Sequence, residues 1–359
     1  MTTPALRFTG PVLPDGDARD LYVVDGKVTY ERQPGADTAA EGWIVPGLVD
    51  AHCHVGLDEN GAVDDATSEQ QAITDRDAGA LLLRDCGSAA DTSWIHDRDD
   101  LPRLVRAGRH IARTKRYIRN FAHEIEPDEL TAYVAQEAER GDGWVKLVGD
   151  WIERDSGDLA PSFPAESFAA AIEVAHEHGA KVTAHCFGEA VLPGLISAGI
   201  DCIEHGTGLT EELVEEMAAR HIALVPTVLQ LNNFPDYADA AGAKFPAYAR
   251  HMHDLHARRR DTIMAAYDAG VEIYAGTDAG GVLPHGNIAG EVRELADYGI
   301  SAIDALGAAS WRARAWLGLD GVLTEGTTAD FVVYERNPLD DLSVLAEPKR
   351  IVLRGVVVA

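Results

Sequence analysis

The chain has few positive charges, few cysteines and no long apolar run, and each shortage excludes a class of protein. Its 31 Lys and Arg residues are outnumbered by 59 Asp and Glu residues, which gives a formal net charge of −28. Nucleic acids and anionic membranes require a basic surface, so we expect neither of them as a partner. No apolar run approaches the roughly 18 to 20 residues of a membrane span.

The four cysteines form no recognisable disulfide or ligand pattern. They are Cys53, Cys86, Cys186 and Cys202, and no two of them make a CxxC pair. A disulfide framework or a cysteine zinc site is therefore not indicated. The first residues also lack the basic segment and apolar run of a secretory signal. We expect a cytoplasmic protein.

Short apolar runs alternate with helical stretches over most of the chain, which is the pattern of repeated strand–helix units. Strands are predicted at residues 44–51, 80–85, 109–113, 144–148, 181–185, 202–205, 223–228 and 271–276. Helices are predicted between them, for example over residues 164–178 and 211–221. Eight such units in series predict an α/β fold of the (β/α)8 TIM barrel type.

At both ends of the chain the sequence predicts short strands and turns in place of strand–helix units. Asp15-Gly16 and Asp25-Gly26 are turn signals beside short strands, and residues 329–334 and 350–358 are predicted strands. We therefore predict two domains. Residues 1–45 and 320–359 would form a small composite β-sandwich, and residues 46–319 would form the barrel.

Polar side chains follow the predicted barrel strands at or near their carboxyl ends. They are His52, His54, Lys146, His185, His205 and Asp278. In an α/β barrel these ends converge on one face, where active sites form. Alternation along the first strand would put both His52 and His54 on one side. Imidazoles and carboxylates bind divalent metals, and a lysine inside an apolar strand is costly unless it is paired or chemically altered.

Several of these segments resemble motifs of the amidohydrolase superfamily. Residues 45–54, with the sequence VPGLVDAHCH, resemble its first-strand signature. His185 and residues 203–206 and 275–279 are similar to its later strand motifs, and residues 329–333 resemble the closing strand of its β-sandwich. The resemblance covers nearly the whole chain and is greatest to the imidazolonepropionase-like branch, which includes metal-dependent dipeptidases.

The resemblance implies a binuclear metal centre. Its ligands would be His52, His54, Lys146, His185, His205 and Asp278. The first two histidines would hold the more buried metal and the other two the second, while the lysine, carboxylated on its side-chain nitrogen, would bridge both. The implied cofactor is two divalent ions, zinc or else manganese, iron or cobalt. Metal-bound hydroxide would attack the amide-type carbonyl of a small molecule, a peptide, an N-acyl amino acid or another amide, with Asp278 as general base and acid.

Alternatives stay open at this point. Lys146 could point outward and pair with a surface carboxylate, leaving a one-metal centre as in imidazolonepropionases and deaminases. Glu189 follows His185 at a spacing that is not the one expected of a deaminase proton shuttle. The same centre could instead hydrolyse a cyclic amide, a lactone or a carbamate, and a non-catalytic scaffold is a remote alternative. The sequence does not decide whether the chain forms a homo-oligomer.

Substrate contacts are expected in the loops that follow the barrel strands. Tyr117 stands about where related dipeptidases carry a histidine, and its hydroxyl could donate to the scissile carbonyl. His285, in a Pro-His-Gly segment, could reach the site or support it. Trp151 could line an apolar pocket, and Arg116 could bind a carboxylate or pair on the surface.

Overall fold

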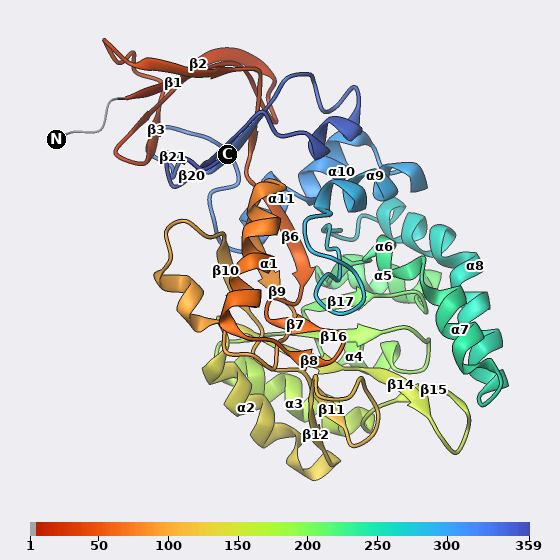
Figure 1. The fold of residues 1–359 in the computed structure, drawn as a ribbon. Coiled ribbons are helices and arrows are strands. Elements are labelled where there is room, and N and C mark those ends of the chain that lie inside the picture. Colours follow the sequence, from red (N-terminus) through yellow and green to blue (C-terminus); the bar gives the residue numbers. More distant parts are fainter. Residues whose placement is uncertain (1–4) are drawn as a thin grey trace.

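The computed structural model describes residues 5–359, in which a β-sheet built from both chain ends lies beside a barrel (Figure 1). The N-terminal strands are β1 (Leu6–Val12), β2 (Asp17–Val24), β3 (Lys27–Thr29), β4 (Asp37–Glu41) and β5 (Trp43–Pro46). The C-terminal strands are β19 (Phe331–Tyr334), β20 (Arg350–Leu353) and β21 (Val356–Val357). Their order is β21-β20-β19-β5-β1-β2-β3, with β4 on β1. The antiparallel pairing of β5 with β19 joins the two ends.

Strand β19 is buried on both faces because it separates two cores. Phe331 and Val333 point into a small core of the sheet, where the rings of Phe331 and Phe8 meet edge to face at 4.8 Å. Val332 and Tyr334 point the other way, into the large core of the barrel. The two-residue period of a strand therefore anchors the sheet to the barrel.

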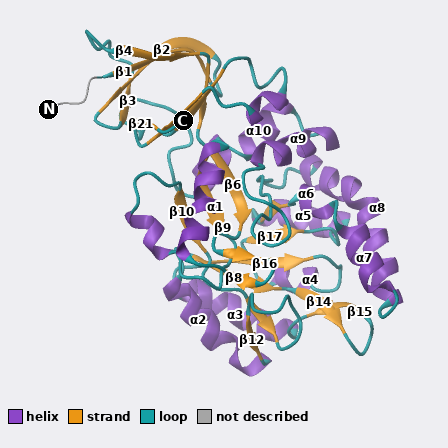
Figure 2. Ribbon diagram, in the orientation of Figure 1, coloured by secondary structure: helices purple, strands orange, loops and turns teal. Residues whose placement is uncertain are grey.

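The barrel is a ring of parallel strands surrounded by helices (Figure 2). Its strands are β6 (Leu48–Cys53), β9 (Ala80–Asp85), β10 (Arg103–Arg106), β11 (Ile111–Arg113), β13 (Trp144–Val148), β16 (Lys181–Cys186), β17 (Cys202–His205) and β18 (Ala223–Val225). β6, β9 and β10 are hydrogen-bonded in series, as are β11, β13, β16, β17 and β18. Residues 273–279 close the ring through single bridges to Leu224 and Cys53. The predicted (β/α)8 fold is confirmed.

Helices cover the outside of the ring. They are α1 (Asp65–Asp77), α2 (Leu130–Arg140), α3 (Ala165–Glu177), α4 (Leu192–Ser197), α5 (Glu211–Arg220), α8 (Pro246–Asp268), α9 (Ile288–Tyr298), α10 (Ala302–Ala308) and α11 (Trp311–Trp316). Short helices α6 (Val228–Leu231) and α7 (Phe234–Gly242) precede α8. Smaller pieces are β7 (Leu57–Asp58), β8 (Gly61–Ala62), β12 (His123–Ile125), β14 (Asp150–Glu153), β15 (Asp158–Pro161) and the 3-10 turns Ser93–Asp97, Pro127–Glu129 and Leu342–Ala346. No helix in residues 5–359 has the length and apolarity needed to cross a membrane.

Four predicted strands differ from those observed. The run 44–51 is two strands, because Gly47 donates its N–H to Asp330 and sends β5 into the end sheet and β6 into the barrel. The third barrel strand is split into β10 and β11, so the prediction at 109–113 found only its second half. The run 223–228 stops at Val225, since Thr227 is left-handed and precedes α6. Residues 271–276 make only a bridge and no regular strand.

Candidate metal centre and active site

Lys146 points into the barrel. Its neighbours on β13, Val145 and Leu147, belong to the core that the barrel shares with its helices, whereas Trp144 packs in the inner cluster. Alternation puts Lys146 on the side of Trp144, and the side chain is 1% exposed. No salt bridge within residues 5–359 includes it. The alternative of an outward, surface-paired lysine is therefore wrong, and the buried ammonium lacks the partner that burial requires.

A bulge turns the two histidines of the first strand inward. Val49 and Ala51 already face the inner cluster, so simple alternation would send residue 52 outward. The register of β6 against β9 shifts between Asp50 and Cys53. After the shift Cys53 lies in the outer core, and His52 and His54 are both buried at the barrel centre. The extra residue of a bulge redirects side chains in this way.

Three residues at the carboxyl ends of the strands are left-handed although none is glycine. They are His205 with φ 67°, Thr227 with φ 48° and Asp278 with φ 59°. Each such conformation costs free energy and persists only where the surroundings fix it. The Asp278 turn is held by Asp50, which accepts hydrogen bonds from the N–H and the hydroxyl of Thr277 at 3.0 and 2.5 Å. The left-handed turn lets His205 face the centre beside its inward neighbour Glu204.

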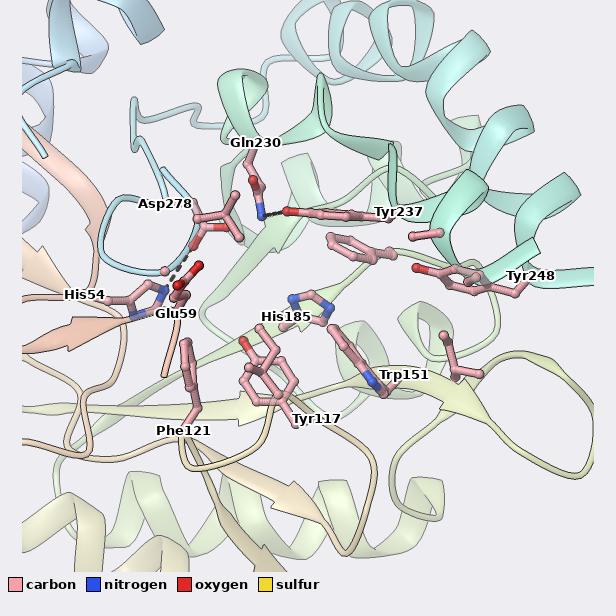
Figure 3. Close-up of a pocket in the computed structure, with 17 residues that line it drawn as sticks. His54, Glu59, Tyr117, Phe121, Trp151, His185, Gln230, Tyr237, Tyr248 and Asp278 are labelled. Carbon is pink, nitrogen blue, oxygen red and sulfur yellow. Dashed lines mark hydrogen bonds and ion pairs between the residues drawn. The ribbon is translucent and has the colours of Figure 1, made fainter. Parts of the chain in front are cut away.

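Asp278 and the first histidine pair converge on one point, and Figure 3 shows Asp278 facing His54. Asp278 Oδ1 lies 3.1 Å from His52 Nε2 and 3.0 Å from His54 Nε2, and the two nitrogens are 3.3 Å apart. His54 Nδ1 donates to the carbonyl of Gly87 at 2.8 Å, so its Nε2 carries a lone pair in the neutral ring. The potential ligand atoms of His52, His205 and Asp278 lie within 4.8 Å of one another. This arrangement fits a divalent cation.

The second histidine pair lies beside the first. The rings of His185 and His205 are 4.7 Å apart, and buried His185 Nε2 has no hydrogen-bond partner among the described residues. His205 Nδ1 is fixed by the Thr227 hydroxyl at 2.7 Å. Burial, together with the charge of Lys146, holds the pKa of His185 well below its usual range, and burial lowers that of His205 to about 3. Both rings are therefore neutral near pH 7, which is the form that binds metals.

Glu204 supports this centre from behind and was not foreseen from the sequence. Its fully buried carboxylate lies 2.7 Å from His52 Nδ1 and 2.9 Å from Arg84 Nη1, and it also accepts from the Thr183 hydroxyl. The Arg84 guanidinium stacks over Trp144 at 4.0 Å. A carboxylate behind a ligating histidine fixes the tautomer and orientation of the ring. The sequence signal that could have indicated this pair is the presence of two charged residues, Arg84 and Glu204, within otherwise buried strands.

A cavity of about 410 Å³ opens beside the two histidine pairs. Its walls include His54, Glu59, Tyr117, Ile118, Phe121, Trp151, Ile152, His185, Phe187, Gln230, Tyr237, Ala240, Ala241, Tyr248, Asp278, Gly281 and Val282. Figure 3 shows Tyr117 and Trp151 on one side of His185 and Tyr237 and Tyr248 on another. The expected Tyr117 and Trp151 therefore line the cavity, while Tyr237 and Tyr248 come from helices that no sequence motif marked.

Other residues considered from the sequence lie away from this cavity. His285 is not among its lining residues, because its Nδ1 pairs with Asp75 Oδ2 at 2.8 Å. Arg116 donates to the Pro161 carbonyl at 2.8 Å and pairs with Glu153. Neither side chain lines the cavity.

A (β/α)8 barrel that gathers four histidines, a lysine and an aspartate at one end of its strands has an arrangement typical of metal-dependent hydrolases. The sequence model of the Amidohydrolase family matches residues 43–358, and the chain belongs to this family. It is therefore an enzyme that hydrolyses carbon–nitrogen bonds, as the resemblance implied.

Several known proteins are similar to this chain along most of its length. An uncharacterized protein of Mycobacterium tuberculosis is 54% identical over 352 residues, which cover 98% of this chain and 95% of that protein. Ochratoxinase of Aspergillus niger is 26% identical, covering 86% of this chain and 73% of that protein. A crystal structure of a Xaa-Pro dipeptidase superposes with a TM-score of 0.82 at 22% identity, covering 98% and 99% of the two chains.

Proposed function

We propose that this amidohydrolase cleaves an amide-type carbon–nitrogen bond of a small molecule at a binuclear metal centre. One observation carries the proposal: His52 Nε2, His54 Nε2 and Asp278 Oδ1 lie within 3.3 Å of one another at the edge of a 410 Å³ cavity. A neighbour of the same fold is a Xaa-Pro dipeptidase, which supports a peptide, an N-acyl amino acid or another amide as substrate.

The donor set fits two divalent ions. His52 and His54 would hold one and His185 and His205 the other, and the unpartnered Nε2 of His185 supports this division. Lys146, buried and without a salt bridge in the described part of the chain, would bridge them as a carbamate, which replaces a costly cation with anionic oxygens. Such ions, when bound, lower the pKa of a shared water and polarise a carbonyl.

Asp278 is suited to move the proton. Burial would raise the pKa of its carboxyl, but the adjacent imidazoles of His52 and His54 hold it well below its usual range. The carboxylate is therefore ionised and lines the cavity, where it would accept a proton from water and return it to the leaving nitrogen. Tyr117 would orient the substrate, because burial raises the pKa of its hydroxyl and keeps that group a hydrogen-bond donor.

The deaminase alternative lacks its proton shuttle. Glu189 is 2.9 Å from His251 Nε2 and is also paired with Arg258. Its carboxylate is not among the groups that line the cavity. This arrangement disfavours deamination.

Metal analysis tests the centre. We expect about two ions per chain in the parent and about one in Lys146→Ala, with hydrolysis of an amide panel falling at least about 1,000-fold. Lys181→Ala is the matched control, because Lys181 is exposed at the start of the neighbouring strand. Equal metal content in the parent and Lys146→Ala would exclude a bridging role for the lysine.

The role of Asp278 has its own test. Asp278→Asn should lower kcat by about 100 to 10,000-fold, the usual contribution of a general base. The exposed Asp268→Asn is the control and should leave kcat unchanged. If Asp278→Asn keeps its metal and works within a few-fold of the parent, the proton is moved by another group.

A further inference from the structure

We infer that the cavity selects an uncharged aromatic amide, one that carries no carboxylate. This inference rests on the proposed function only for the bond that is cleaved. The selectivity is argued from the walls of the cavity, which determine what can bind there whichever reaction the centre catalyses.

Aromatic rings form a continuous wall next to the second histidine pair. Tyr117 contacts Trp151 edge to face at 5.0 Å, and Trp151 stacks with Phe187 at 6.5 Å. Both Trp151 and Phe187 also approach His185, at 5.4 and 4.1 Å. A planar aromatic group would find both faces and edges to pack against here. The volume of about 410 Å³ lies in the range that takes a drug-sized molecule.

Away from the proposed metal centre, the cavity walls in the described part of the chain offer no cation for a substrate carboxylate. Among residues 5–359, no Lys or Arg side chain lines it, and its two charged wall groups are the carboxylates of Asp278 and Glu59. The nearby arginines are already engaged, Arg116 with Glu153 and Arg258 with Glu189. A carboxylate held between aromatic rings would be stripped of water with no partner, which is strongly unfavourable.

The polar groups that remain are neutral donors. Tyr237 accepts a hydrogen bond from Gln230 Nε2 at 3.0 Å, and Gln230 Oε1 accepts in turn from Asn233 at 2.8 Å. Figure 3 shows the Tyr237 oxygen facing Gln230. Because Tyr237 accepts in this bond, its hydroxyl hydrogen can be donated to a molecule in the cavity that it lines. A neutral oxygen, such as a carbonyl or ether, matches this donor.

A matched substrate pair tests the inference. N-benzoyl-phenethylamine and N-benzoyl-phenylalanine are identical aromatic amides apart from the carboxylate of the second. We would measure Kd by calorimetry and kcat/KM by amine release with the metal-loaded full-length enzyme. We expect the carboxylate to raise Kd and to lower kcat/KM, each at least about 30-fold, because its loss of water is not compensated by a partner.

A variant with an added charge makes the test specific. Ile152→Arg would place a guanidinium at the cavity wall, and it should recover at least about tenfold of the affinity for the acid. Ile152→Gln, which is also unbranched and polar but carries no charge, should not. Recovery of the acid in both variants would mean that size and not charge excludes it, which would overturn the inference.

The outcomes separate this inference from the proposed function. Equal or tighter binding of the acid overturns the inference and leaves amide hydrolysis standing. Preferential binding of the uncharged amide supports it. If that binding occurs with no metal-dependent turnover of either compound or of an amide panel, the proposed function fails while the selectivity of the cavity holds.

Discussion

Replacing Glu204 by glutamine is a direct test of how the centre is built. The change keeps the shape of the side chain and removes its charge. Glu204 and Arg84 are both 0% exposed, and Glu204 also accepts from His52 at 2.7 Å. In Glu204→Gln the Arg84 guanidinium stays inside the barrel without a counterion. The new amide nitrogen, a donor, would also face hydrogen-bond donors that surround both carboxylate oxygens in the parent.

The burial of both partners sets the size of the effect. An exposed ion pair is worth about 0 to 1 kcal/mol, whereas removing one partner of a buried pair costs about 3 to 5 kcal/mol. We therefore expect Glu204→Gln to lower the free energy of unfolding by about 3 to 5 kcal/mol. His52 Nδ1 then faces a neutral amide in place of a carboxylate, so metal affinity should fall a further 10 to 100-fold, about the usual effect of an outer-shell change.

Denaturant unfolding of Glu204→Gln, Arg84→Met and the double variant measures this coupling. The double variant should be less destabilised than the sum of the single ones by at least about 1 kcal/mol, because it leaves no unpaired charge. Glu215→Gln, at an exposed site on α5, is the control and should change stability by less than about 0.5 kcal/mol. A loss below about 1 kcal/mol for Glu204→Gln, with unchanged metal affinity, would refute the reasoning.

Three further predictions concern other parts of the chain. Hydrogen bonds from Glu189 and Asp158 outweigh burial and raise the pKa of His251 from 6.5 to about 9. The stabilisation that His251 contributes is therefore complete below about pH 6.5 and is lost as the pH rises through 9. The free energy of unfolding of His251→Gln, measured from about pH 6 to 10, should not fall in this way. If it falls as in the parent, another group causes the pH dependence. Gly276→Ala puts a Cβ 2.5 Å from that of His52, so metal content measured by elemental analysis should fall, and full occupancy would count against the packing. Phe331→Ala should cost about 3 to 5 kcal/mol in unfolding experiments with metal content retained; a much smaller loss would show that the end sheet unfolds separately.

The sequence by itself determined the barrel and its family. Parallel strands buried on both faces appear as largely apolar runs, so residues 80–85 and 144–148 were predicted with the bounds that are observed. Residues 202–205 were also predicted with the observed bounds, although two of the four are polar. Helices with polar outer faces filled the gaps between them. The apolar run 44–51 misled because two strands of different sheets follow one another there. The local signal of the break is the Pro46-Gly47 pair between them.

The tertiary structure alone decided where the side chains at the strand ends point. The bulge in β6 and the left-handed turn at His205 reverse the alternation on which a reading of the sequence depends. The partnership of Glu204 with Arg84 joins residues 120 positions apart. The walls of the cavity likewise come from helices and loops far from one another in the chain. Local pattern records how a residue suits a strand or a helix, whereas contacts across the barrel arise only when the ring closes.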